Sequence, residues 1–112
     1  ELATAAQYGL PIIAVVLDNS MLGTIRMHQE REYPGRISAT SLVNPDFAAM
    51  ARSFGGFGAT VERTADFAPA FRAAEASGLA SVVHVKFDPD GIAPTATLSA
   101  MRAKSLAKSL GA

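Results

Sequence analysis

The feature that most constrains the fold is an unbroken run of six apolar residues, 12–17, bounded by Pro11 and by the polar residues Asp18 and Asn19. The run is far too short to cross a bilayer, and its length fits a strand that is buried on both faces. Such strands are typical of parallel sheets that helices cover on both sides. The run therefore predicts an α/β fold.

The rest of the chain alternates between helical and extended patterns. We expect helices over residues 1–8, 22–32, 44–54 and 97–110, a further helix from residue 64 or 66 to residue 77, and strands over residues 12–17, 57–62 and 80–87. Pro69 favours a start of the fourth helix near Asp66 rather than Thr64, because proline is tolerated in the first turn of a helix. The alternation predicts a three-layer α/β domain over residues 1–112, with a mostly parallel sheet and helices on both faces.

Two of the expected helices have predicted ends and buried faces. Asn44 is expected to cap the third helix, with Pro45 in its first position and Asp46 near its positive end. Gly78 is expected to end the fourth helix. The predicted apolar faces comprise Phe47, Met50, Ala51 and Phe54 in the third helix, and Phe67, Ala70, Phe71 and Ala74 in the fourth.

Composition excludes several classes of function. The formal net charge is zero and no strongly basic field is present, so neither nucleic acid nor an anionic membrane is an expected partner. The chain has no cysteine, which excludes disulfides and thiolate metal sites and fits a cytoplasmic protein. The basic residues Arg102, Lys104 and Lys108 are expected on a solvated helix face, or in contact with another domain or subunit.

The beginning of the chain resembles the second half of a helix. Residue 1 is Glu1, and no residue precedes it that could cap a helix, whereas Gly9 and Pro11 mark the end of this segment clearly. Three strands are also few for a doubly wound sheet. We therefore expect that the N-terminal part of the domain is missing from these 112 residues.

The end of the first strand is the strongest candidate for a ligand site. Ligands of open α/β sheets bind beyond the carboxyl ends of the strands, where this chain places Asp18 and Asn19 before a turn and a helix start. Carboxylate and amide oxygens suit Mg²⁺, and the free N–H groups of a helix start attract phosphate. A metal-bridged diphosphate would fit here, although a polar triplet after a strand is more often only a turn.

Several segments resemble thiamine-diphosphate-dependent enzymes of the acetolactate synthase group. The resemblance is carried by residues 1–5, 7–12 and 18–24, and it continues through 26–35, 44–55, 63–67 and 92–102. It implies the C-terminal, diphosphate-binding domain of an enzyme, a transferase or lyase that uses thiamine diphosphate and Mg²⁺. It also implies a small 2-oxo acid as substrate and a homo-oligomer as the assembled state.

The resemblance assigns roles to individual residues. Asn19 would bind Mg²⁺ through its side-chain oxygen, and Met21 through its backbone carbonyl. Leu22 and Gly23 would lie beside the diphosphate. Residues that fall on the family's cofactor-binding and substrate-side positions are Met21, Leu22, Gly23, Thr24, Ile25 and His28.

The chain also departs from the family pattern. Asp18 stands where the family has the first asparagine of an Asn-Asn pair, and no Gly-Asp-Gly triplet occurs in the sequence. The aspartate of that triplet is a principal Mg²⁺ ligand in the family, and the catalytic glutamate lies in another domain. The resemblance therefore implies no catalytic residue here, and we expect these residues alone to be inactive.

Other interpretations remain open. Without the resemblance, His28 belongs to a solvated helix face, and His84 points to solvent or to a partner helix. The chain could be a small standalone α/β binding or signalling module in which Asp18 binds Mg²⁺ or accepts phosphate. It could also be a structural dimerisation fragment whose uncovered sheet edge drives self-association.

Overall fold

A computed structural model describes residues 1–111 and contains a parallel sheet of three strands. These are β1 (Ile13–Asp18), β2 (Phe57–Val61) and β3 (Ser81–Lys86), in the order β1-β3-β2. Ser81 of the central strand pairs with Ile13 on one side and with Phe57 on the other. The three carboxyl ends therefore point the same way, as the alternating pattern predicts.

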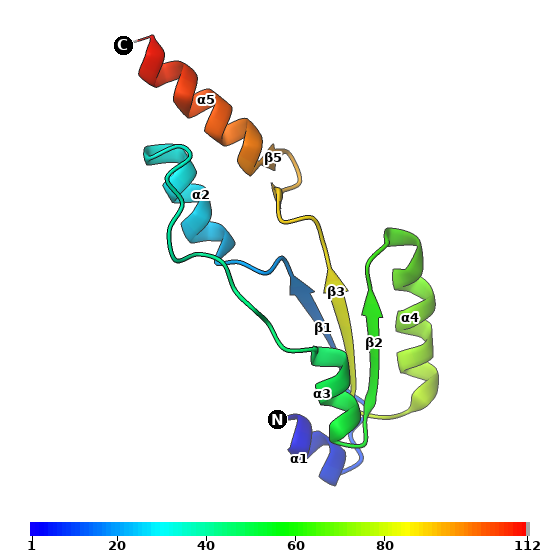
Figure 1. Ribbon diagram of the computed structural model, residues 1–112. Coiled ribbons are helices and arrows are strands. Elements are labelled where there is room, and N and C mark those ends of the chain that lie inside the picture. Colours follow the sequence, from blue (N-terminus) through cyan, green and yellow to red (C-terminus); the bar gives the residue numbers. More distant parts are fainter. Residues whose placement is uncertain (112) are drawn as a thin grey trace. The chain divides into compact units, whose positions relative to one another are not determined.

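Helices cover both faces of this sheet, which confirms the three-layer prediction. Figure 1 shows α3 (Phe47–Ser53) and α4 (Thr64–Ser77) on opposite sides of the strands. Val83 of β3 is buried against Ala74 of α4, and Val61 completes this small core. The next residue of β3, His84, faces the other way and contacts the ring of Phe47 in α3. The period of two along β3 thus assigns alternate side chains to the two helices.

One glycine sets how closely α3 can approach the sheet. A Cβ atom added to Gly58 of β2 would lie 2.0 Å from the backbone oxygen of Ala48. Any side chain at this position would therefore push the helix away from the strand. Ala48 is itself completely buried, so the contact lies in a packed interior.

The first helix, α1 (Leu2–Gln7), belongs to the same compact unit, which comprises residues 1–18 and 44–87. Gly9 follows it with φ of +63°, in the left-handed region that glycine adopts without strain. This end of the helix agrees with the prediction from Gly9 and Pro11.

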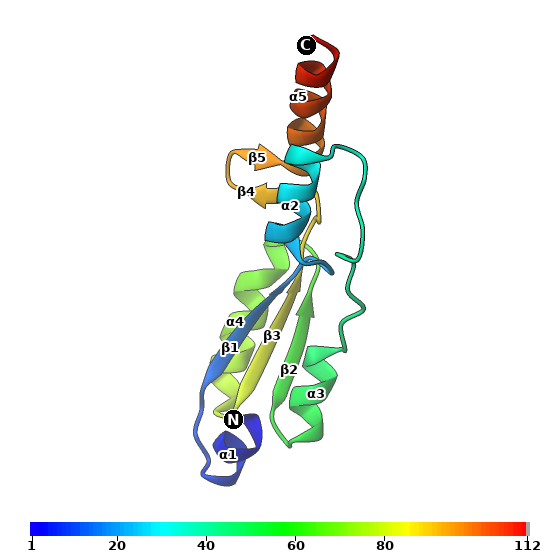
Figure 2. The same ribbon diagram turned by 90° about the vertical axis from the view of Figure 1, so that its left-hand side faces the viewer.

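A second compact unit contains residues 19–43 and the chain from residue 88 onward. It includes α2 (Gly23–Glu32), the short strands β4 (Gly91–Ala93) and β5 (Ala96–Thr97), and α5 (Leu98–Leu110). The antiparallel β4–β5 hairpin, visible in Figure 2, is absent from the sequence prediction because its strands are too short to show a pattern. Both helices agree with their predicted ranges to within one residue at each end.

The predicted burial of the first strand on both faces is wrong. Leu17 is 69% exposed and Val15 is 40% exposed. In the part of the chain that the structure describes, β1 is an edge strand that pairs with β3 alone, while α4 packs against β2 and β3. An unbroken apolar run therefore does not distinguish a central strand from an edge strand.

Three predictions about helix ends and faces are corrected by the structure. Asp46, not Asn44, caps α3 and accepts a hydrogen bond from the N–H of Ala49 at 2.9 Å. The buried residues of α3 are the small Ala48 and Ala51 rather than the large apolar side chains. The helix α4 starts at Thr64, not near Asp66, and contains Pro69. Residues predicted to be buried but at least one-third exposed are Met50, Phe54 and Phe67.

Candidate functional site

The candidate site is built on a tight turn that begins directly after β1. The side-chain oxygen of Asn19 accepts a hydrogen bond from the N–H of Met21 at 3.3 Å, which folds the side chain back onto the turn. Ser20 between them has φ of +54°, an uncommon conformation for a residue with a side chain. Asn19 and Met21 are both half-buried. The two predicted metal ligands thus lie within one turn of backbone.

The helix that follows the turn has an uncapped start. The N-cap residue of α2 is Leu22, whose side chain cannot accept a hydrogen bond from the first-turn N–H groups. A Cβ atom on Gly23 would lie 2.9 Å from Nδ2 of Asn19 and 3.0 Å from Cδ1 of Ile92. The absence of a side chain at Gly23 therefore lets Asn19 and Ile92 pack directly against the start of α2. Such a helix start, with free N–H groups and positive dipole, favours an anion.

The remaining predicted site residues follow along α2. Gly23 is half-buried, whereas the residues predicted to approach the cofactor or substrate, Leu22, Thr24, Ile25 and His28, are exposed. Ile25 is 52% exposed, which is high for an apolar side chain in a helix. Exposure of His28 fits both of its interpretations, a solvated helix face and a position that a ligand could reach.

A neighbouring segment, the strap (residues 38–42), runs antiparallel to the turn. The N–H of Leu22 donates to the carbonyl of Thr40, and the N–H of Leu42 donates to the carbonyl of Ser20, each at 2.9 Å. Met21 and Ser41 form the bridge between these two bonds. The backbone of the turn is therefore hydrogen-bonded on both sides of Met21.

Two side chains of α2 fasten the strap to the helix. Arg26 donates through Nε to Oγ1 of Thr40 at 2.5 Å and through Nη2 to Oγ of Ser41 at 3.0 Å. Gln29 donates to the carbonyl of Ser38 at 2.8 Å and accepts from the hydroxyl of Thr40 at 3.2 Å. Thr40 is only 2% exposed. Sequence reasoning missed this network, because partners 9–15 residues apart leave no periodic signal.

Asp18 has a different environment from the one expected. It is buried, with its Oδ2 at 2.8 Å from Nε2 of His84, while its Oδ1 accepts a hydrogen bond from Asn44 at 2.8 Å. His84 is 1% exposed and contacts Phe47, so its predicted orientation toward a helix is confirmed and that toward solvent is wrong. Nδ1 of His84 has no hydrogen-bond partner among the described residues.

An ion pair between a buried glutamate and a partly exposed arginine joins α2 to α5. Glu30 is fully buried and accepts two hydrogen bonds from the guanidinium of Arg102 and one from the N–H of Gly35. The side-chain hydrogen bond from Arg102 is the main reason that the pKa of Glu30 lies below its ordinary value, against the opposing effect of burial. Arg102 thus pairs with Glu30 while its side chain stays 44% exposed, and Lys104 and Lys108 are exposed, as a solvated helix face predicts.

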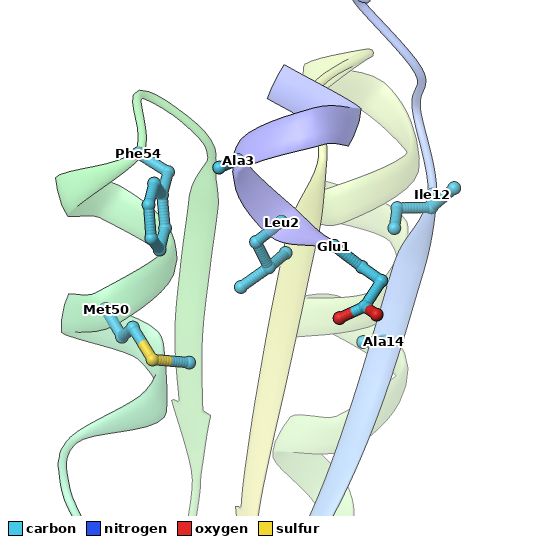
Figure 3. A pocket seen from close by; sticks show the side chains of 7 residues that line it. All are labelled: Glu1, Leu2, Ala3, Ile12, Ala14, Met50 and Phe54. Atoms are coloured by element: carbon cyan, nitrogen blue, oxygen red, sulfur yellow. The ribbon is translucent and has the colours of Figure 1, made fainter. Parts of the chain in front are cut away.

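Two cavities lie away from the turn. The larger, about 370 Å³, is apolar and lies between α1, β1 and α3, as Figure 3 shows. It is lined mainly by Leu2, Ile12, Met50 and Phe54, with the Glu1 carboxylate at its side. The smaller is lined by the basic residues Arg31, Lys104 and Lys108, together with Met101 and Ser105. Neither gathers the donor set that a metal-bound diphosphate needs.

Residues 1–111 hold neither a cluster of metal-binding side chains nor a membrane-spanning helix. No group of three or more His, Cys, Asp or Glu side chains in this range could hold a metal ion. No helix among these residues is long and apolar enough to span a membrane.

Comparisons with known proteins give a consistent result. Residues 1–85 match the family model described as thiamine pyrophosphate enzyme, C-terminal TPP binding domain. The chain is similar to the acetolactate synthase large subunit of Parasynechococcus marenigrum (strain WH8102), with 49% identity over 57 residues, or 49% of the chain and 9% of that protein.

Two further relatives extend this result. The putative thiamine pyrophosphate-containing protein YdaP of Bacillus subtilis is 42% identical over 86 residues, which is 76% of the chain and 15% of that protein. Acetolactate synthase isozyme 2 large subunit of Escherichia coli is 41% identical over 64 residues, 56% of the chain and 12% of that protein. The chain thus matches only a small part of the length of each relative.

Proposed function

Because the chain belongs to the thiamine pyrophosphate enzymes, as part of their C-terminal TPP-binding domain, we propose that residues 19–24 hold the diphosphate of thiamine diphosphate through Mg²⁺. Asn19 would contribute its side-chain oxygen and Met21 its backbone carbonyl to the metal. Leu22, Gly23 and Thr24 would surround the diphosphate at the start of α2.

The close packing of Asn19 against Gly23, at the start of α2, is the observation that carries this proposal. A Cβ atom at Gly23 would lie 2.9 Å from Nδ2 of Asn19, so the glycine lets the proposed ligand lie directly against the start of α2. The helix has no side-chain cap, which leaves its first N–H groups for phosphate oxygens. Amide and carbonyl oxygens are hard ligands that suit Mg²⁺. The residues present therefore fit the group that the family uses.

The parent reaction is proposed from the relatives. Bound thiamine diphosphate supplies the carbanion chemistry by which such enzymes act on 2-oxo acids. We expect an acetolactate synthase-like carboligation or a decarboxylation, in a homo-oligomeric transferase or lyase. Within this chain the residues bind and orient, and His28, exposed in the second turn of α2, is proposed to border the substrate.

The standalone signalling module is the weaker alternative. Asp18, its expected metal ligand or phosphate acceptor, is 6% exposed and bonded by both His84 and Asn44. A carboxylate engaged in this way is poorly placed to accept a phosphoryl group from solution. The burial of Asp18 therefore favours the cofactor-binding proposal.

The 112 residues alone are expected to turn over no 2-oxo acid, since no Gly-Asp-Gly triplet is present to supply the family's acidic metal ligand. Release of product from pyruvate by the purified chain, abolished by chelating Mg²⁺, would contradict this expectation.

The binding proposal is tested on the protein expressed from its complete coding sequence. Titration calorimetry measures the affinity for thiamine diphosphate at fixed Mg²⁺ concentrations. Replacing Asn19 by Ala removes one metal ligand and should weaken binding about 10- to 100-fold or more, whereas Arg31→Ala, an exposed change on α2, should leave it unaltered. Equal affinities of the Asn19→Ala variant and the unsubstituted protein would rule out Asn19 as a ligand.

A further inference from the structure

The strap fixes the backbone on either side of Met21, the residue whose carbonyl is proposed as a ligand. Ser20 accepts from Leu42 and Leu22 donates to Thr40, so the two neighbours of Met21 are both held by backbone hydrogen bonds of 2.9 Å. The bridge between Met21 and Ser41 lies between these bonds. The direction of the Met21 peptide is thereby set by the strap and not by the turn alone.

Unfavourable backbone conformations occur in both partner segments. Ser20 in the turn has φ of +54° and Ala39 in the strap has φ of +53°. A residue with a side chain adopts this region only when its surroundings impose it, at a cost of about 1–3 kcal/mol each. The hydrogen bonds around them must offset this cost, which indicates a segment built to hold one geometry.

Thr40 lies at the centre of a network of side-chain hydrogen bonds that joins the strap to α2. Its hydroxyl is buried, accepts from Nε of Arg26 and donates to Oε1 of Gln29. Arg26 also reaches Ser41, and Gln29 bonds both backbone groups of Ser38. The strap is thus bonded to α2 at Ser38, Thr40 and Ser41, three of its five residues.

We propose that Arg26, Gln29 and Thr40 are positioning residues for the metal site, acting through the strap on the carbonyl of Met21. This inference rests on the proposed function, since it concerns the same turn. None of the three residues needs to touch cofactor or metal. Their effect belongs to the class in which outer hydrogen bonds orient the groups that bind a metal directly.

The test compares Thr40→Val, which removes the hydroxyl at nearly constant volume, with Thr40→Ser, which keeps it. Arg26→Leu removes the hydrogen bonds from the guanidinium to Thr40 and Ser41. Arg31→Leu is the matched control, because Arg31 is an exposed residue of the same helix. The protein from the complete coding sequence is titrated with thiamine diphosphate over a series of Mg²⁺ concentrations. Hydrogen exchange at Leu22 and Leu42 reports on the strap itself, without cofactor.

Thr40→Val and Arg26→Leu should raise the Mg²⁺ concentration needed for half-maximal cofactor binding about 10- to 100-fold. They should also speed exchange at Leu22 and Leu42, while Thr40→Ser and Arg31→Leu remain close to the unsubstituted protein. Leu98→Ala, a destabilising change at a buried residue of α5, should lower the melting temperature and leave the Mg²⁺ dependence unchanged. That contrast separates positioning from general stability.

The other possible outcomes contradict either the positioning role or the proposed function, and they can be told apart. If the unsubstituted protein binds the cofactor and Thr40→Val and Arg26→Leu keep its Mg²⁺ dependence, the positioning role is wrong and the proposed function stands. If Leu98→Ala shifts the Mg²⁺ dependence as much as they do, the strap contributes stability only. If the unsubstituted protein does not bind thiamine diphosphate with Mg²⁺, the proposed function fails, and this inference with it.

Discussion

At the carboxyl end of β1, one buried carboxylate holds two partners from distant parts of the chain. Asp18 is bonded by Asn44 and by His84, which lie 26 and 66 residues further on. A buried polar group that loses its partner is costly, because water cannot replace the lost bond. The aspartate in place of the family's asparagine thus has a structural use, since it can accept from both neighbours.

Asp18→Ala is expected to lower the free energy of unfolding by about 3 kcal/mol, because it leaves the buried ring of His84 and the partly buried amide of Asn44 without an acceptor. Asp18→Asn keeps one acceptor oxygen and should cost less. Urea denaturation monitored by circular dichroism measures both. Equal losses for the two variants would show that packing, and not hydrogen bonding, determines the contribution of this side chain.

Gly58 gives a second prediction for a single residue. Gly58→Ala places a methyl group 2.0 Å from the carbonyl oxygen of Ala48, so α3 must shift. Overpacking of this kind costs about 1–3 kcal/mol or more in the free energy of unfolding. Gly91→Ala is the control, because its Cβ would meet only the oxygen of Asp88, at an ordinary 3.5 Å. A Gly58→Ala variant as stable as the control would contradict the close approach.

The pH dependence of stability should show the contribution of Glu30. Its pKa is lowered from the ordinary value of 4.5, mainly by the hydrogen bond from Arg102. A carboxyl whose pKa is lower in the folded protein stabilises it above the pKa of the unfolded chain. This contribution disappears as the pH falls through the folded-state pKa.

Glu30→Gln should therefore be less stable than the unsubstituted protein at pH 7, by about 1.5–3 kcal/mol for lost hydrogen bonds to a charged group. The difference should shrink as the pH falls below the ordinary pKa of 4.5. Urea denaturation at pH 7, 5 and 3 measures it. A difference that stays constant with pH would show that the charge of Glu30 does not contribute.

Among the helices, α5 has the clearest local signal for its start. Thr97 is its N-cap, and the hydroxyl accepts a hydrogen bond from the N–H of Ala100 at 3.1 Å. Thr97→Ala should cost about 0.5–2 kcal/mol in the free energy of unfolding. Thr64→Ala, in the first turn of α4 but not at its cap, is the matched control. Similar losses in the two variants would contradict the capping role.

The helices could be predicted well from sequence because their signals are local. Thr97 and Gly78 lie where capping chemistry requires them, and Gly78 has φ of +62° as a left-handed C-cap. Asn44 shows the limit of such reasoning. It has the composition of a cap, but its side chain bonds Asp18, and Asp46 caps the helix instead.

The candidate site could be predicted only in part, for the same reason. The turn and the start of α2 are contiguous, so resemblance to a family pattern is enough to propose Asn19 and Gly23 as site residues. The strap is bonded to α2 by pairs 9–15 residues apart, and no spacing rule anticipates such pairs. The burial of His84 likewise depends on β1 and α3 being its neighbours, which only the fold determines.

On the scale of the whole chain, the exposed apolar side chains of β1 predict self-association. Leu17 and Val15 lie on an edge strand, and an edge with such side chains can pair with another copy. The 112 residues in isolation are expected to sediment as a mixture whose mean mass rises with concentration. Leu17→Lys should reduce this association, because a charge on an edge strand opposes pairing. A monomer at all concentrations would refute the expectation.

The loop between α2 and the strap is held at both ends by hydrogen bonds to α2, so it can accept inserted residues. Gly35 is bonded to Glu30 and Ser38 to Gln29, while Arg36 and Ile37 between them are exposed. Extra residues inserted after Arg36 would be looped out between two fixed points, where chain length costs little free energy. Natural variants of different loop length, or an engineered epitope tag, can therefore be accommodated here without altering the geometry of the Met21 turn.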